Sequence, residues 1–313
     1  MVDNPRPAVR GTAHSWSCAE RDVLAEAVDA APSVHNSRPW RLRVDGPLVE
    51  LRQTPVSGLD EHDPHGRDQR MSCGAALANL LLAVRHLGLL PIVRREIEPG
   101  AARLVATVEA ERLGDALPEE QRRYSAIARR RTHRGAFAPE AVPATTLEQV
   151  RSAGELEPHE SRWISGAEDA AVLGRALAYA ARVMRDDLDY QRELSTWLVD
   201  EGVPVGIPKE SLGQRGLSAV GLATGRTRLP DEEVLAARAE RESVLVLCSS
   251  GDDPLDHVRI GEAAEAVWLE AVARELAASV MTQPLRLAEV RDRLSSDLGL
   301  DAVPHLLMRL GHP

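Results

Sequence analysis

The chain has 313 residues, of which 43% are hydrophobic and 27% charged, and its formal net charge is -10 at pH 7. This composition is typical of a soluble globular protein with one large core or two medium ones. The negative charge argues against a nucleic-acid partner, because phosphate backbones require a basic face. No stretch of 18 consecutive apolar residues and no apolar signal core at the N-terminus is present. We therefore expect no membrane span and a cytoplasmic location.

The first third of the chain alternates helix and strand patterns. Ser17 and Glu20 form a capping box in front of a helical pattern that Pro32 ends. Apolar and polar residues alternate on both sides of Asp45-Gly46, which predicts a β-hairpin. A later stretch is apolar nearly all round, so its helix is expected to be buried. The expected elements are a helix at 18–31, a hairpin at 40–54, a buried helix at 72–87, and strands at 90–98 and 102–110.

The remaining chain repeats this order of elements. A helix begins near 118 and is expected to continue into an arginine cluster. Further helices are expected at 145–153, 167–182, 260–277 and 285–299, and strands at 243–250, 278–283 and 304–311. The buried helices around Gly74 and Gly261 both start with small residues and continue with large ones, which suggests an internal repeat, although coincidence remains open.

Residues 198–233 form the least regular stretch, rich in Gly and Pro and long for a connection. Loops of this length are usually lids or binding loops, and a surface excursion is the alternative.

Two polar clusters are candidate binding sites. The first comprises Arg129, Arg130, Arg131 and Arg134 with Thr132 and His133. Arg130 and Arg134 are four residues apart and are expected to share one face of a helix, where they could bind a phosphate. The alternative is a solvated basic face. The second is "APSVHNSRPW", residues 31–40, a proline-braced loop with Ser33, His35, Asn36 and Arg38. It suits recognition of a flat heterocycle, and the alternative is a helix stop in which Ser33 and Asn36 satisfy backbone groups.

Other chemistries are disfavoured. His62 and His65 lie among Asp60, Asp63 and Asp68 in a polar segment, which favours a solvated turn over a metal site. Ser33 and His35 are two apart in an extended loop and should point to opposite sides, which argues against a nucleophile pair. The three cysteines are Cys18, Cys73 and Cys248, with no C-x-x-C spacing, so neither a disulfide framework nor a zinc knuckle is expected. Neither a G-x-G-x-x-G dinucleotide fingerprint after a strand nor a P-loop is present.

Taken together, "APSVHNSRPW", "RDQRMSCGAALANLLLAVRHLG", "RRRTHRGAF", "GVPVGIPKESLG" and the helix around Gly261 occur in the order found in the nitroreductase superfamily. They resemble most closely the Acg-like FMN-binding family of actinobacteria, over about residues 20–311. The most specific elements are A-P-S-x-H-N-S-x-P-W and R-R-T-x-R-x-x-F, about 95 residues apart.

The resemblance implies an α+β nitroreductase-like fold built twice in one chain, each half standing for one subunit of the usual intertwined homodimer. The halves would be 1–115 and 116–313, the second with a lid-like insertion at about 198–233. Because each motif occurs once, one FMN site is expected at the internal interface, with a degenerate mate. A monomer is favoured, and a homodimer remains open.

The resemblance also assigns site residues. Arg130, Arg131, Thr132 and Arg134 would hold the FMN phosphate and ribityl chain. Pro32, Ser33, His35 and Asn36 would line the isoalloxazine, with Arg38 in the position of the family's Gln. Thr282 and Gln283 match the region near flavin N5 and O4. His133 replaces an acidic residue of the motif, and a basic tail that reaches the phosphate in relatives has no counterpart after "RLGHP".

Two functions follow from the resemblance. In the first, the protein is an FMN-dependent oxidoreductase that passes hydride or electrons through flavin N5 to a small-molecule acceptor, with NAD(P)H as a possible donor. No dedicated catalytic side chain is then required. In the second, it sequesters FMN or binds a ligand beneath a closed lid, without turnover.

Overall fold

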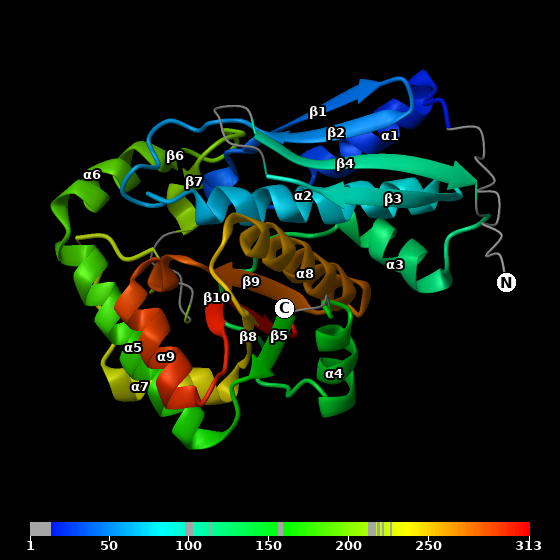
Figure 1. Cartoon of the computed structure of the whole chain (residues 1–313). Coiled ribbons are helices and arrows are strands. Elements are labelled where there is room, and N and C mark those ends of the chain that lie inside the picture. The colour runs from blue at the N-terminus through cyan, green and yellow to red at the C-terminus, as the bar shows by residue number, and fades with distance from the viewer. Residues whose placement is uncertain are drawn as a thin grey trace, which may run out of the picture.

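Two long helices that the sequence predicts to be buried lie against each other at the centre of the molecule (Figure 1). They are α2 (Arg67–His86) and α8 (Pro254–Ala273). The computed structural model describes residues 14–97, 103–112, 114–155, 159–211, 217, 220, 222–225 and 227–313.

The two helices approach closely because glycines face each other's backbone. A Cβ added to Gly74 would lie 1.9 Å from the carbonyl oxygen of Val258, and one added to Gly261 would lie 2.0 Å from that of Met71. Each of the two aligned glycines of the suspected repeat therefore leaves room for the backbone of the other helix where α2 and α8 cross.

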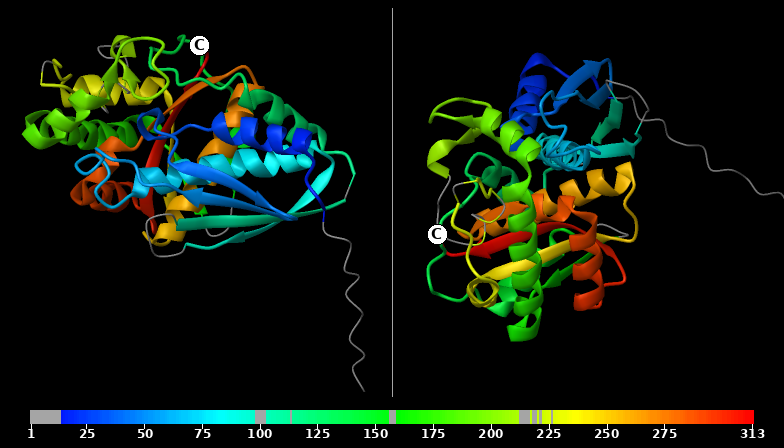
Figure 2. Two further views of the ribbon diagram at one scale, coloured as in Figure 1. Left: turned by 90° about the horizontal axis from the view of Figure 1, so that it is seen from above. Right: turned by 90° about the vertical axis from the view of Figure 1, so that its left-hand side faces the viewer.

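A four-stranded antiparallel sheet lies on each side of this helix pair (Figures 1 and 2). The first has the order β1-β2-β4-β3 and the second β5-β8-β10-β9. In both, the long helix connects the second strand of the chain to the third, which supports the internal repeat. The strands are β1 (Trp40–Asp45), β2 (Leu48–Gln53), β3 (Leu89–Arg95), β4 (Arg103–Arg112), β5 (His159–Trp163), β8 (Ser243–Ser249), β9 (Ala277–Met281) and β10 (Val303–Gly311).

The second sheet is covered on both faces. Leu245 and Leu247 of β8 point into the central core, whereas Val244 and Val246 pack into a second core against α5 and its neighbours. This alternation is the period-two pattern of a strand, here apolar on both faces. The other described elements are α1 (Cys18–Asp29), α3 (Pro118–Ile127), α4 (Ala144–Ser152), α5 (Gly166–Asp186), α6 (Leu188–Trp197), α7 (Glu232–Arg241), α9 (Ala288–Leu298), β6 (Leu198–Val199), β7 (Ile207–Pro208) and the short 3₁₀ turns η1 (Val34–Asn36), η2 (Lys209–Ser211) and η4 (Gln283–Arg286).

Both central helices begin earlier than the apolar pattern predicts, because acidic side chains cap them. The Asp63 carboxylate accepts the N–H groups of Asp68 and Gln69 at 3.1 and 3.0 Å, so α2 begins at Arg67. Asp253 caps α8 in the same way. These carboxylates satisfy free N–H groups at the helix starts, so the polar residues that follow belong to the helices.

The prediction that the arginine cluster is helical is wrong. Helix α3 ends at Ile127, and the following segment runs beside β9 instead. Thr132 bridges to Ala278, and the His133 N–H donates to the Ala278 carbonyl at 2.9 Å. Arg130 and Arg134 therefore do not share a helical face.

Candidate functional site

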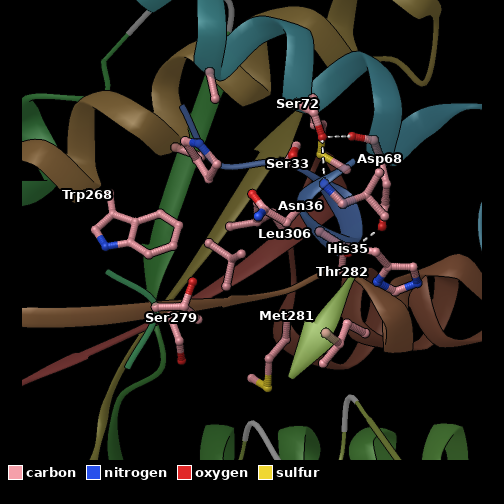
Figure 3. Close-up of a pocket in the computed structure, with 18 of the residues that line it drawn as sticks. Ser33, His35, Asn36, Asp68, Ser72, Trp268, Ser279, Met281, Thr282 and Leu306 are labelled. Carbon is pink, nitrogen blue, oxygen red and sulfur yellow. Dashed lines mark hydrogen bonds between the residues drawn. The ribbon is translucent and has the colours of Figure 1, made fainter. Parts of the chain in front are cut away.

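A cavity of about 400 Å³ lies where α2, α8 and β9 meet (Figure 3). Side chains of α2 and α8 form part of its wall, as do the ends of β9 and β7. The two polar clusters singled out in the sequence, 32–36 and 130–134, both line it. A volume of this size is in the range of small-molecule and cofactor sites.

Ten of the eleven residues predicted for the site line this cavity. They are Pro32, Ser33, His35, Asn36, Arg130, Arg131, Thr132, Arg134, Thr282 and Gln283. Arg38 is exposed and does not line it. Val203, Gly206, Ile207, Pro208 and Leu222 of the irregular stretch also contribute; within that stretch, 212–216, 218–219, 221 and 226 lie outside the described residues.

The loop at 32–38 is held rigidly against α2. Ser33 Oγ accepts the N–H of Arg38 at 3.0 Å, and the Val34 N–H donates to Ser72 Oγ at 3.0 Å. His35, Asn36 and Arg38 have φ values of 47°, 54° and 48°, the left-handed region that non-glycine residues seldom adopt. Strain of this kind persists where surrounding contacts determine the backbone, as at a binding loop.

Arg130 reaches into the cavity and contacts three groups. Its guanidinium donates to the carbonyl oxygen of Ala30 at 3.0 Å and lies over the Trp268 ring, 4.6 Å from the centroid. Its Nε lies 3.6 Å from a carboxylate oxygen of Glu265. Burial lowers the pKa of Arg130 from its usual value, although Glu265 opposes that effect. The arginine is therefore oriented before any ligand arrives.

The other end of the cavity carries a buried acid. The Thr282 hydroxyl donates to a carboxylate oxygen of Asp68 (Figure 3). The same oxygen lies 3.5 Å from His62 Nε2. Burial alone would raise the pKa of Asp68, but His62, Arg67 and Thr282 hold it below the usual value. Because the Thr282 hydrogen is committed to this carboxylate, its oxygen offers lone pairs to the cavity.

His62 is buried whereas His65 is exposed, so the expectation of a solvated turn is wrong for His62 and holds for His65. His62 is only 3% exposed, and its ring meets that of His35 edge-on at a centroid distance of 4.1 Å. Helix α6 covers it: Glu193 accepts the N–H groups of Glu61 and His62 at 2.9 and 2.7 Å. Tertiary packing against α6, which no local pattern indicated, excludes the solvent.

Residues after α6 form hydrogen bonds with the loop at 32–38. The Gly206 N–H donates to the His35 carbonyl at 2.8 Å, and the Asn36 amide donates to the Pro204 carbonyl. Residues 203–208 therefore close one side of the cavity, as a lid would.

Sequence reasoning did not single out Glu265, Trp268 or Ser72 for the site. Glu265 carried a signal, since it is an acidic residue in a helix that is otherwise largely apolar. Its position in the cavity depends on the crossing of α2 and α8, which sequence spacing alone does not define.

A second polar cluster includes residues that contact α2, and none of its three members lines the cavity. Asp252, His257 and His305 place one ligand atom each within 4.8 Å of one another. Arg67 and Arg291 flank Asp252 at 3.8 and 3.3 Å, and Arg67 also lies 3.4 Å from His305 Nδ1. Two guanidinium groups in this position disfavour a metal cation.

Comparison with known proteins agrees with this architecture. No family model matches the chain. "Putative NAD(P)H nitroreductase Rv3131" of Mycobacterium tuberculosis is 31% identical over 99% of this chain and 90% of its own length. "Putative NAD(P)H nitroreductase acg" of the same organism is 29% identical over 93% of this chain and 89% of its own length. The crystal structure of a nitroreductase-type protein from Anabaena variabilis has a TM-score of 0.53 and 11% identity, covering 95% of this chain and 74% of that one.

The fold and the motif-lined cavity define a nitroreductase-like protein. The chain belongs to the nitroreductase superfamily, in its Acg-like family. Throughout the described part of the chain, helices are too short or too polar to cross a membrane.

Proposed function

We propose that the cavity binds FMN and that the protein is an FMN-dependent oxidoreductase. The observation that carries the proposal is the meeting of the two family motifs, 32–36 and 130–134, at one cavity. Two polar atoms there also lack hydrogen-bond partners among the described residues, His35 Nε2 and Arg130 Nε. Buried polar groups without partners are costly, so a ligand with polar edges and an anionic end fits this cavity.

The residues of this chain would bind and orient the flavin. Arg130, Arg131 and Arg134 would hold the phosphate, helped by the Thr132 hydroxyl. The 32–36 loop would line the ring system, and Thr282 with Gln283 would contact its polar edge. The lid residues 203–208 would exclude water from the ring. When bound, the isoalloxazine accepts a hydride at N5 and passes electrons on, so the protein supplies position and electrostatics.

NAD(P)H is proposed as the electron donor, because the curated relatives are named for it. We propose a small molecule as the acceptor. A visible spectrum of the purified protein loaded with FMN tests FMN binding, and anaerobic addition of NADH or NADPH to the same sample tests the electron donor. Loss of flavin absorbance on addition is expected, and a protein that cannot be loaded with FMN would contradict the proposal.

A second function remains testable with the same sample. The hydrogen bonds from Asn36 and Gly206 hold the lid on the loop, which favours an FMN-sequestering or ligand-binding protein without turnover. Bound FMN that dithionite reduces but neither nicotinamide reduces would support this alternative.

The phosphate assignment has its own test. Arg131 is exposed and lines the cavity, whereas its neighbour Arg129 pairs with Glu275 outside the cavity. We expect Arg131→Gln to weaken FMN binding about tenfold, the loss of one charge-assisted hydrogen bond. Binding of riboflavin, which has no phosphate, should change little. Arg129→Gln is the matched control, and equal losses in both variants would refute the assignment.

A further inference from the structure

Glu265 is a buried carboxylate in the wall of the proposed flavin cavity. It projects from α8, its side chain is 0% exposed, and neither oxygen has a hydrogen-bond partner in the described part of the chain. An ionised carboxylate in such a place costs several kcal/mol of free energy unless it is paired or neutralised. The proposed function leaves this residue without a role.

The groups that face Glu265 come from three elements. Arg130, after α3, is the charged one, with its Nε 3.6 Å from a Glu265 oxygen. From α2 comes the amide of Asn79, which donates to the Ala27 carbonyl and whose Oδ1 has no partner among the described residues. On α8 itself, Trp268 lies under the Arg130 guanidinium. Burial raises the pKa of Glu265 to about 8, although Arg130 and Asn79 oppose the shift.

A phosphate held by Arg130 would compete with Glu265 for the same guanidinium. Two anionic groups a few ångströms apart in a cavity of low dielectric repel strongly, so the phosphate and an ionised Glu265 disfavour each other. A protonated Glu265 removes this repulsion and leaves the whole guanidinium to the phosphate.

We propose that Glu265 couples phosphate binding at Arg130 to proton uptake, so that FMN binds when the Glu265 carboxylate has taken one proton from solvent. The inference rests on the proposed function, since it requires FMN in this cavity. It assigns to Glu265 a positioning role and makes cofactor affinity depend on pH.

The test is the dissociation constant of FMN between pH 7 and pH 9. The FMN phosphate, whose second pKa is near 6, is a dianion throughout this range. In the wild type we expect FMN affinity to fall about tenfold from pH 7 to pH 9. At pH 9, about one unit above the pKa of Glu265, binding must first protonate this carboxylate. Riboflavin lacks the phosphate and should show no such fall.

Glu265→Gln mimics the protonated carboxyl. We expect its FMN affinity to be constant over this range and about tenfold tighter than that of the wild type at pH 9. Glu275→Gln is the matched control, because it neutralises an 83% exposed carboxylate beside Arg129, outside the cavity. Its affinity should fall with pH as in the wild type.

The outcomes separate this inference from the proposed function. FMN that binds at pH 7 with unchanged affinity at pH 9, or a Glu265→Gln variant that keeps the wild-type slope, overturns the role of Glu265 alone. Absence of FMN binding at pH 7 overturns both. Should Glu265→Gln fail to fold, calorimetry of the wild type at pH 8.5 in buffers of different ionisation enthalpy decides. Uptake of roughly half a proton or more per FMN and none per riboflavin is expected, and no uptake contradicts the proposal.

Discussion

Arg38, which the family resemblance places where a glutamine is expected, does not line the cavity although its loop does. It is exposed, its φ is 48°, and its N–H donates to Ser33 Oγ. Its contribution to the loop therefore comes from the backbone, and the guanidinium is free to differ from the family pattern.

We therefore expect Arg38→Gln to change FMN affinity by less than about twofold, which titration of the protein with FMN measures. Ser33→Ala is the informative comparison, because it removes the acceptor of the Arg38 N–H and should cost about 1 kcal/mol of stability. A tenfold loss of affinity in Arg38→Gln would mean that the side chain reaches the cofactor after all.

At this scale the sequence identified the two motifs and the strand end that line the cavity, but it missed the acidic Glu265 and the aromatic Trp268. Ser33, Asn36 and Arg130 belong to motifs that a reader can recognise without a fold. Asp68 was considered only as a member of a possible metal cluster, although its carboxylate accepts from Thr282, more than 200 positions away. Such pairs are fixed by tertiary packing, which no local spacing reports.

The central element is the crossing of α2 and α8, which depends on two glycines. We expect Gly74→Ala and Gly261→Ala each to destabilise the protein by about 3 kcal/mol or more, because the added Cβ would overlap a backbone carbonyl that cannot rotate away. The melting temperature of each variant should then lie roughly 6 °C or more below that of the wild type.

Gly225→Ala is the control for this pair. An added Cβ there meets nothing within 4 Å, so stability should stay within about 1 kcal/mol of the wild type. Equal melting temperatures for all three variants would contradict the crossing.

Helices and strands were predictable where residues close together in the sequence determine the local structure. The capping box of Ser17 and Glu20 and the turn at Gly46 appear as expected. The arginine segment was misread because arginine favours helix, whereas pairing of Thr132 with Ala278 draws the chain along β9. Strand β5 and helices α6 and α7 were not predicted, and each depends on neighbours distant in sequence.

At the scale of the whole molecule, the matching strand orders of the two sheets support the prediction that one chain replaces a dimer. In the aligned repeat, Glu262 corresponds to Ala75, which lines the cavity. Arg95 is the last residue of β3, and the corresponding last residue of β9 is Met281, which also lines the cavity. Arg95 donates to both carboxylate oxygens of Glu262 at 2.7 Å, so this ion pair occupies the position that would correspond to a second cavity.

We therefore expect a monomer with one FMN per chain. Light scattering after gel filtration should give a mass near 34.1 kDa, and flavin released by heat should equal the protein in molar amount. A species of twice this mass would contradict the monomer, and two flavins per chain would contradict the blocking of the second cavity by Arg95 and Glu262.

The buried Glu265 also predicts how the stability of the whole chain depends on pH. Its carboxyl has an ordinary pKa of 4.5 and a folded-state pKa raised to about 8 by burial. Between these values the native state holds a proton that the unfolded state has lost, so stability falls as pH rises. This contribution is complete below pH 4.5, is lost as pH passes 8, and is on the order of 5 kcal/mol.

Urea unfolding of the flavin-free protein from pH 5 to pH 9 measures the effect. Relative to the wild type, Glu265→Gln should gain stability as pH rises, because a neutral amide has no proton to lose. Glu275→Gln should keep a constant difference from the wild type, since that carboxylate is exposed. Wild-type and Glu265→Gln curves that run parallel across this range would show that the carboxyl ionises in the folded protein as readily as in the unfolded chain.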